Sequence, residues 1–278
     1  MPKLSIIIPT FNAGASIERC LRSINKQTFT DYEVVIQDGG SSDNTIELIG
    51  DFRRGYAGAE IRLYQEPDKG IYDAMNKAKH RANGEWLYFL GSDDELYEPN
   101  VVSRLLGSQD AALGDVLYGN VKVIGNAGWA RDGAVYDGPF DLKKLLTRNI
   151  CHQALFYRAA LLRTIGNYNT RYVAWADWDL NMRCWSKTAF KYVDVIIAKF
   201  YAGGVTSQDR PDENFAADMA ANVMKYFSLS IDGPVTNGLA FVGYPDLVRM
   251  QHPRKLSRFK LGRALTRLGR TLKILRDR

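Results

Sequence analysis

Cysteine is scarce in this sequence: 278 residues contain only three, Cys20, Cys151 and Cys184. They are far apart and odd in number, and none belongs to a CxxC pair of the kind found in zinc sites and redox motifs. Neither a disulfide framework nor a cysteine-based metal site is therefore indicated. We expect three reduced thiols in the core of a cytosolic protein.

Long apolar runs are also missing. No segment approaches the roughly 18 apolar residues that a membrane-spanning helix requires. The apolar run at residues 4–8 is too short for a signal-peptide core and stops at Pro9. We therefore expect neither a transmembrane anchor nor a secretion signal. The motifs GxGxxG and GxxxxGK are absent as well, which argues against dehydrogenase and P-loop chemistry.

A net positive charge is absent from most of the chain, although the whole carries a formal charge of +6. Residues 254–278 contain ten Lys or Arg and one Asp, a net of +9, which leaves −3 for the remainder. The main body therefore gives no support for a polyanion binder. We expect no nucleic-acid partner.

What is present in the first half is an alternation of strand and helix patterns. Strands are predicted at residues 4–8, 33–36, 61–64 and 86–90, and helices at 15–27, 45–52 and 71–82. Such alternation is typical of a mostly parallel sheet, in which ligands bind at the carboxyl ends of the strands. Residues 115–135 indicate short strands. We therefore expect an α/β fold with a small added mixed sheet and C-terminal helices.

The loops at the expected strand ends are polar or rich in glycine. They are 9–14 (PTFNAG), 37–45 (QDGGSSDNT), 66–70 (EPDKG) and 92–94 (SDD). Asp38 and Gly39 place a carboxylate beside a backbone that a flat ligand can approach, and Lys69 suits a phosphate. Each loop taken singly also fits ordinary turn and helix-cap chemistry. Their shared edge favours a nucleotide site.

Two adjacent carboxylates, Asp93 and Asp94, follow the strand predicted at residues 86–90. Mg²⁺ and Mn²⁺ prefer carboxylate oxygen, and a Mg²⁺ site usually combines one or two carboxylates with substrate phosphate oxygens. One interpretation is therefore a diphosphate held through a metal. The other is that the pair caps a helix beginning near residues 97–99, which include an early proline.

Taken in order, these motifs resemble those of the family 2 glycosyltransferases of bacterial surface-polysaccharide type, whose fold is called GT-A. The motifs are PTFN at 9–12, DGGSSD at 38–43, DKGIYDAMN at 68–76 and SDD at 92–94. The likeness runs from about residue 4 to about residue 201. It implies a nucleotide-sugar donor, a divalent metal (Mn²⁺ or Mg²⁺) and inversion at the anomeric carbon.

The resemblance also implies roles for single residues. Asp38 would contact the base, Asp94 would hold the metal, and Asp93 would lie against the ribose or the sugar. The full set expected to bind the donor is Pro9, Thr10, Phe11, Asn12, Asp38, Gly39, Lys69, Asn76 and Asp93. One departure is Gln37, where many members have a second Asp. This departure leaves the identity of the nucleotide open.

A His-Gln pair, His152 and Gln153, lies in a segment at residues 150–156 that indicates another strand. It resembles a His-Gln pair that lies near the site in bacterial members of the family. The three histidines of the chain are not spaced as a metal-ligand set. A structural role for His152 is therefore favoured, and a role beside the acceptor is the alternative.

Two acids open a helix predicted after Trp175, in the sequence Trp175-Ala176-Asp177-Trp178-Asp179. Acids are favoured at a helix N-terminus by the dipole and by capping. Sugar transfer nevertheless needs a base for the acceptor hydroxyl, and a carboxylate within hydrogen-bond reach can serve. Asp177 matches the family's catalytic-base position and is favoured over Asp179. Trp175 and Trp178 could form apolar walls or stack on sugar faces.

Three regions are expected: a GT-A catalytic domain at residues 1–205, a helical extension at 206–252 and a basic amphipathic helix at 253–278. In the last region, leucines recur at spacings of four and three among Arg and Lys. An anionic membrane surface is its favoured partner. Packing on the body or on another subunit and nucleic-acid contact are the alternatives.

The expected function is transfer of a hexosyl or N-acetylhexosaminyl group, preferably from a UDP-sugar, to a hydroxyl of a lipid-linked or growing saccharide in surface polysaccharide biosynthesis. The enzyme would lie on the inner face of the cytoplasmic membrane. A non-catalytic nucleotide-sugar binding or scaffold protein and a nucleotidyltransferase stay open. The leaving group distinguishes these classes. A glycosyltransferase releases a nucleoside diphosphate, a nucleotidyltransferase releases pyrophosphate, and a binding protein releases neither.

Overall fold

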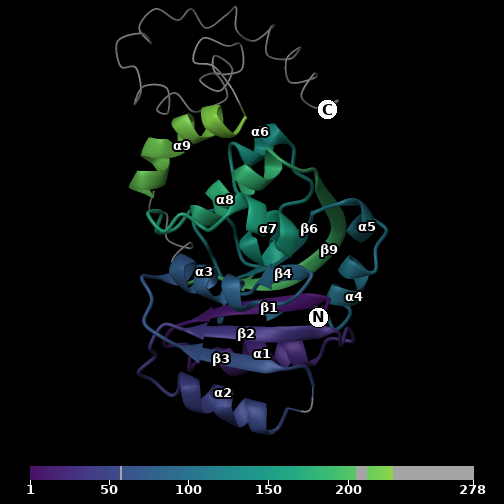
Figure 1. Cartoon of the computed structure of the whole chain (residues 1–278), viewed down its shortest axis with the longest axis vertical. Coiled ribbons are helices and arrows are strands. Elements are labelled where there is room, and N and C mark those ends of the chain that lie inside the picture. The colour runs from purple at the N-terminus through teal and green to yellow at the C-terminus, as the bar shows by residue number, and fades with distance from the viewer. Residues whose placement is uncertain (57, 205–211, 228–278) are drawn as a thin grey trace, which may run out of the picture.

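The computed structural model of the chain describes residues 1–56, 58–204 and 212–227. One nine-stranded sheet runs through it in the order β3-β2-β1-β4-β8-β6-β9-β5, with β7 paired to β6. Figure 1 shows β1, β2 and β3 together at one end of the molecule, with the long, curved β9 in the other half. The predicted α/β class is confirmed.

The first half alternates strands and helices as predicted. Its elements are β1 (Leu4–Thr10), α1 (Ile17–Asn25), β2 (Tyr32–Asp38), α2 (Thr45–Arg54), β3 (Ile61–Gln65), α3 (Ile71–Arg81) and β4 (Trp86–Phe89). The four strands pair in parallel, with β1 between β2 and β4. Every residue of β1 and β2 is buried, because both faces of this part of the sheet are covered. The carboxyl ends of the strands therefore meet at one edge.

The second half extends the same sheet with strands of mixed direction. Its elements are β5 (Glu95–Leu96), α4 (Val101–Leu106), α5 (Asp110–Leu113), β6 (Val116–Ile124), β7 (Val135–Tyr136), α6 (Leu142–Leu145), the short 3₁₀ helix η1 (His152–Ala154), β8 (Leu155–Arg158), α7 (Ala159–Ile165), α8 (Ala176–Trp185), β9 (Phe190–Tyr201) and α9 (Glu213–Tyr226). β8 joins the two halves, since it pairs antiparallel with both β4 and β6.

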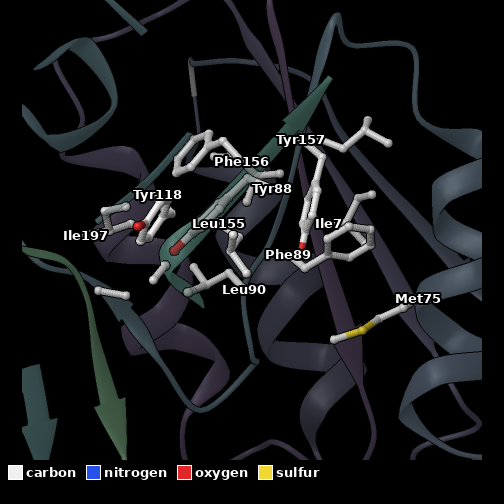
Figure 2. Packing of buried hydrophobic residues seen from close by; sticks show 14 of the residues in the cluster. Ile7, Met75, Tyr88, Phe89, Leu90, Tyr118, Leu155, Phe156, Tyr157 and Ile197 are labelled. Atoms are coloured by element: carbon white, nitrogen blue, oxygen red, sulfur yellow. The ribbon is translucent and has the colours of Figure 1, made fainter. Parts of the chain in front are cut away.

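Part of the core lies where the two halves of the sheet join. Tyr88 of β4 stacks on Phe156 of β8 with 4.3 Å between ring centroids, and both side chains are fully buried. Figure 2 shows these rings among Leu155, Tyr157 and their neighbours. The Tyr88 hydroxyl also donates to the carbonyl of Gln153 at 3.0 Å. The core packing therefore fixes η1 beside the end of β4.

The structure differs from the sequence prediction at two places near this junction. Residues 150–156 do not form one strand, because His152–Ala154 form η1 and β8 begins only at Leu155. Asp93 and Asp94 do not cap a helix, because β5 follows them directly and α4 begins later, at Val101. The helix-cap interpretation of the pair is therefore wrong.

β9 has no counterpart among the predicted strands. Its twelve residues, Phe190–Tyr201, include charged side chains at Lys191, Asp194 and Lys199, which interrupt the apolar pattern. α9 lies within the segment 206–252, for which a helical extension is predicted.

All three cysteines are free, with Cys20 and Cys184 buried and Cys151 half-buried. Among the helices of the described residues, none is long and apolar enough to cross a membrane. The predicted boundary at residue 205 and the basic helix predicted at 253–278 lie outside the described residues.

Candidate active site

A pocket of about 580 Å³ opens at the carboxyl ends of β1, β2 and β4, and the start of α3, η1 and the end of β9 complete its wall. The predicted site residues that line it are Pro9, Thr10, Phe11, Asn12, Gly39, Asp93, Asp94 and His152. Those outside the lining are Asp38, Lys69, Asn76, Trp175, Asp177, Trp178 and Asp179. The strand-end loops therefore share one pocket, as their places in the sheet predict.

Hydrogen bonds between the first two strand-end loops hold one side of the pocket. The Gly39 N–H donates to the carbonyl of Thr10, and the Ser42 N–H donates to the side-chain oxygen of Asn12, both at 2.9 Å. Asn12 has a φ of 47°, in the left-handed region that Asn tolerates better than most residues. The acceptor oxygen of Asn12 is therefore used to join the loops.

Asp38 is fully buried, and its carboxylate turns back onto its own loop. One oxygen accepts from the backbone N–H groups of Gly40 and Ser41 at 2.9 Å each, and the other accepts from the Ser41 hydroxyl at 2.5 Å. A Cβ on neighbouring Gly39 would lie 2.4 Å from the Asp68 carboxylate. Asp38 thus shapes the loop that brings Gly39 to the pocket, and its contact with a base stays a prediction.

Lys69 and Asn76 have surroundings unlike those of the pocket residues. Lys69 is exposed, and its backbone N–H donates to the Asp73 carboxylate at 3.0 Å. Asn76 is buried; its Nδ2 donates to the carbonyl of Tyr168 at 3.0 Å, and its Oδ1 accepts from the Tyr168 N–H at 2.8 Å. Asn76 therefore ties the segment around residue 168 to α3.

Asp94 is a buried carboxylate whose pKa is strongly raised. It is 2 % exposed, and its two oxygens accept from the Gln153 side chain at 2.6 Å and from the Tyr201 N–H at 2.9 Å. Burial, followed by the charge of Asp93, raises its pKa from 3.8 to about 7. A nearby cation favours the ionised form of such a group, so this is a position that a divalent cation would stabilise.

The two adjacent carboxylates face the same small space above Gly91. A Cβ at residue 91 would lie 2.7 Å from an oxygen of Asp93 and 2.7 Å from an oxygen of Asp94. Two carboxylates fit Mg²⁺ or Mn²⁺, whose remaining positions are filled by water and substrate phosphates. The described part of the chain holds no group of three or more His, Cys, Asp or Glu that could bind a metal. A cation here would therefore depend on the substrate for further ligands.

Asp177 lies behind the pocket wall, in the first turn of α8. It is 5 % exposed; Oδ1 accepts from the Trp178 N–H at 2.9 Å and lies 3.0 Å from the Tyr72 hydroxyl. Oδ2 accepts from the Asn149 side chain at 2.9 Å and lies 3.8 Å from Nδ1 of His152. Tyr72 and His152 both line the pocket, so the carboxylate lies next to the pocket wall.

The two tryptophans beside Asp177 belong to the packing between α8 and α9. Their rings contact Phe215 of α9, with 5.5 Å between centroids for Trp175 and 5.2 Å for Trp178. The Trp178 indole also donates to the carbonyl of Leu145 at 2.7 Å. The structure therefore places both rings in an aromatic cluster, and their stacking on sugars stays a prediction.

Asp179 joins the same two helices. It is 1 % exposed and accepts from Nε of Arg183 at 2.9 Å and from the Tyr226 hydroxyl at 2.6 Å. Arg183 belongs to α8 itself, and the contact with Tyr226 links α8 to the end of α9. The geometry is that of a buried ion pair supporting helix packing, whereas Asp177 in the same first turn of α8 contacts residues of the pocket wall.

Three residues that contact Asp94 or Asp177 were not assigned these contacts from the sequence. Gln153 contacts Asp94 across 59 positions of sequence, and Tyr72 contacts Asp177 across 105. Tyr72 stands within the DKGIYDAMN motif and Gln153 within the His-Gln pair, so a signal for each is present. Asn149 belongs to no motif, and its contact with Asp177 depends on the tertiary fold alone.

Solved structures share this arrangement of the chain. TarS residues 1–349 of S. aureus, in complex with UDP-GlcNAc, matches with a TM-score of 0.67 and 20% identity, over 92% of this chain and 74% of that chain. The mannosyltransferase PcManGT from Pyrobaculum calidifontis, in complex with GDP-Man and Mn²⁺, matches with a TM-score of 0.56 and 15% identity, over 98% and 80%. The predicted GT-A fold is therefore confirmed, and with it the structural class of the glycosyltransferases.

Proteins with similar sequences show which glycosyltransferase family the chain belongs to. The family model for glycosyl transferase family 2 matches residues 5–165. A PGL/p-HBAD biosynthesis glycosyltransferase of Mycobacterium tuberculosis (strain ATCC 25177 / H37Ra) is 42% identical over 221 residues, covering 77% of this chain and 82% of that protein. Chondroitin synthase of Escherichia coli is 29% identical over 70% of this chain and 28% of the synthase. The chain belongs to glycosyl transferase family 2.

Proposed function

We propose that this glycosyltransferase is inverting and metal-dependent, and that it moves a hexosyl or N-acetylhexosaminyl group from a UDP-sugar to an acceptor hydroxyl. The observation that carries the proposal is the pocket shared by the strand-end loops, with the Asp93–Asp94 pair in its lining and the buried acid Asp177 next to its wall. The complexes of TarS with UDP-GlcNAc and with UDP support the choice of nucleotide.

The donor would lie along the strand-end loops. Phe11 lines the pocket and is 62% exposed, so its ring is available to a nucleoside. Asp93 and Asp94 would hold a divalent cation, which when bound offsets the negative charge that builds on the departing nucleoside diphosphate. Gly39, where an added Cβ would lie 2.4 Å from the Asp68 carboxylate, lets the backbone of the second loop approach the ligand.

The acceptor hydroxyl must lose its proton while it attacks the anomeric carbon. Asp177 would supply the basic group, because it is a buried acid in contact with two residues of the pocket wall, Tyr72 and His152. The new bond would form as the bond to the diphosphate breaks, on the opposite face of the sugar. A single displacement of this kind inverts the configuration at the anomeric carbon.

For the acceptor we propose a lipid-linked or growing saccharide in surface polysaccharide biosynthesis. Relatives named for PGL/p-HBAD biosynthesis and for chondroitin synthesis support a glycolipid or a polysaccharide. The basic segment 254–278, which lies outside the described residues, supports peripheral binding to the inner face of the cytoplasmic membrane. Its charge and leucine spacing suit an anionic surface.

Product analysis tests the proposal. The wild-type protein, given a UDP-sugar and a saccharide acceptor, should release UDP and form a linkage whose anomeric configuration, read by NMR, is opposite to that of the donor. Asp177→Asn should lower turnover by about 10²-fold or more in a folded protein. Near-normal turnover of this variant would show that the base is misassigned. Release of pyrophosphate would indicate a nucleotidyltransferase, and binding without release would indicate a scaffold.

A further inference from the structure

We propose that Arg19 is a positioning residue for the proposed cation site. From α1 it holds the backbone of Asp93 and the end of β9, and it thereby fixes the geometry of the Asp93–Asp94 pair. The inference rests on the proposed function, because it assigns a role toward the cation proposed above. Arg19 lies outside the pocket lining, so it acts through the residues that it contacts.

The segment that carries the acidic pair lies against α1 and is held there by its backbone. Nη2 of Arg19 donates to the carbonyl of Asp93 at 2.7 Å, and the Ser23 hydroxyl, one turn further along α1, accepts from the Leu96 N–H at 3.0 Å. A hydrogen bond from a charged donor is stronger than a neutral one. Because Arg19 binds the carbonyl of Asp93, this contact leaves the Asp93 carboxylate to the pocket.

The guanidinium of Arg19 makes two further contacts. Its Nε lies 3.2 Å from Oε1 of Glu95, which is an ion pair, and its plane lies 4.0 Å from the ring centroid of Tyr201. A guanidinium can pair with a carboxylate and stack on an aromatic ring at the same time, whereas an ammonium is a single point charge. Arg19 therefore joins α1, the acidic segment and the end of β9.

Tyr201 transmits this constraint to Asp94. Its backbone N–H donates to Oδ1 of Asp94 at 2.9 Å, and its hydroxyl donates to Glu95 at 2.5 Å. The other oxygen of Asp94 accepts from the Gln153 side chain at 2.6 Å. Both oxygens of Asp94 are thus oriented by hydrogen bonds, and one of these bonds comes from the residue on which Arg19 stacks.

Glu95, the third acid in the run, is occupied by the same contacts. Oε1 is contacted by Arg19 and by the Tyr201 hydroxyl, and Oε2 lies 3.3 Å from Nζ of Lys199. Glu95 also lies outside the pocket lining. Two carboxylates are therefore left for a cation, and their relative position becomes decisive. Mg²⁺ requires a nearly ideal octahedral arrangement, whereas Ca²⁺ accepts a flexible one.

The test measures cation binding directly, with UDP present to supply phosphate oxygens. Mn²⁺ is titrated into the protein and followed by electron paramagnetic resonance, and Mg²⁺ and Ca²⁺ are measured by competition. Arg19→Gln should raise the Kd of Mn²⁺ by about tenfold, as expected for a residue that orients metal ligands. The ratio of Mg²⁺ to Ca²⁺ affinity should fall by about threefold or more, because the pair is less rigidly held.

Arg22→Gln is the matched control, because Arg22 lies one turn further along α1 and pairs with exposed Glu18 on the helix surface. This variant should keep the wild-type Kd and the wild-type ratio. Arg19→Lys keeps the charge but loses the planar group that makes three contacts, so its Kd should lie between those of the wild type and Arg19→Gln. Circular dichroism and thermal unfolding establish that each variant is folded.

A wild-type Kd and an unchanged ratio in folded Arg19→Gln would overturn the inference and leave the cation proposal intact. A lower melting temperature without a change in cation binding would overturn it too, since a purely structural residue behaves in that way. Full recovery in Arg19→Lys, or an equal loss in Arg22→Gln, would show that charge acts rather than position. Absence of UDP-dependent Mn²⁺ binding by the wild-type protein would instead overturn the proposed metal dependence.

Discussion

At the scale of single residues, three buried aspartates differ because their neighbours differ. Asp38 accepts three hydrogen bonds from its own loop, and Asp177 accepts from residues of three separate segments. Asp94 lies beside another carboxylate, which together with burial raises its pKa. The same residue type thus shapes a loop, supports a pocket wall and offers a cation site.

The raised pKa of Asp94 predicts a pH-dependent cost in the metal-free protein. The folded carboxyl holds its proton up to about pH 7, whereas the unfolded one loses it near 3.8, so the folded state binds more protons between these values. Stability should therefore fall as the pH rises through this window, by up to about 1.4 kcal/mol per unit. The stability of Asp94→Asn should not fall in this way, because an asparagine side chain does not ionise.

Chemical denaturation in the presence of a chelator, at steps from pH 4 to pH 8, checks this prediction. The stability of Asp94→Asn relative to the wild type should grow up to about pH 7 and then level off. Adding Mn²⁺ should stabilise the wild-type protein above that pH and leave the variant unaffected. A difference between the two proteins that is independent of pH would contradict the account of Asp94.

At the scale of elements, the site depends on how closely the loops approach the strands. Gly84, between α3 and β4, is an example: a Cβ there would lie 2.4 Å from the backbone nitrogen of Ser5 in β1. The Gly84 N–H also donates to the Ser5 hydroxyl at 2.7 Å. This contact sets the position at which β4 enters the sheet, and β4 ends just before the Asp93–Asp94 pair.

Gly84→Ala should therefore destabilise the protein by about 1–3 kcal/mol, because backbone atoms cannot move aside as a flexible side chain can. Gly50→Ala is the matched control. Gly50 lies within α2, where the nearest atom to an added Cβ is a guanidinium nitrogen of Arg54 at 3.7 Å. Alanine there should stabilise by up to about 1 kcal/mol. Urea denaturation measures both; equal effects would show that the loop is not tightly packed.

Much of the architecture can be predicted from the sequence, and the reason lies in particular elements. The apolar run at residues 4–8 and the helical spacing of Ile17, Cys20 and Ile24 indicate burial from neighbouring residues alone. β1 and α1 could therefore be predicted from the sequence. The direction of the Asp38 carboxylate could not be predicted, because the same DGGS sequence suits both a turn and a contact with a ligand. The contact of His152 with Asp177 could not be predicted either, because it depends on how η1 and α8 pack against each other.

At the scale of the whole molecule, charge is divided between an acidic body and a basic C-terminal segment. Residues 254–278 carry +9 and the rest carries −3. We predict that the full chain floats with anionic lipid vesicles and that a chain ending at residue 253 does so much less. Each Lys or Arg near such a surface contributes about 1 kcal/mol before screening, so added salt should weaken binding.

A variant that changes the leucines of this segment to serine keeps the charge and tests the apolar contribution. The residues are Leu261, Leu265, Leu268, Leu272 and Leu275. We expect weaker flotation than for the full chain at the same salt concentration. Equal flotation of the full and shortened chains would remove the membrane assignment.

The central claim is metal-dependent sugar transfer at the strand-end pocket, and release of nucleoside diphosphate tests it most directly. The wild-type protein and Asp94→Ala are given a panel of nucleotide sugars with Mn²⁺, with Mg²⁺ or with chelator, and with a membrane lipid extract as acceptor. The account predicts release from one donor, abolished by chelator and by Asp94→Ala. Equal release with chelator, or release that survives in Asp94→Ala, would contradict it.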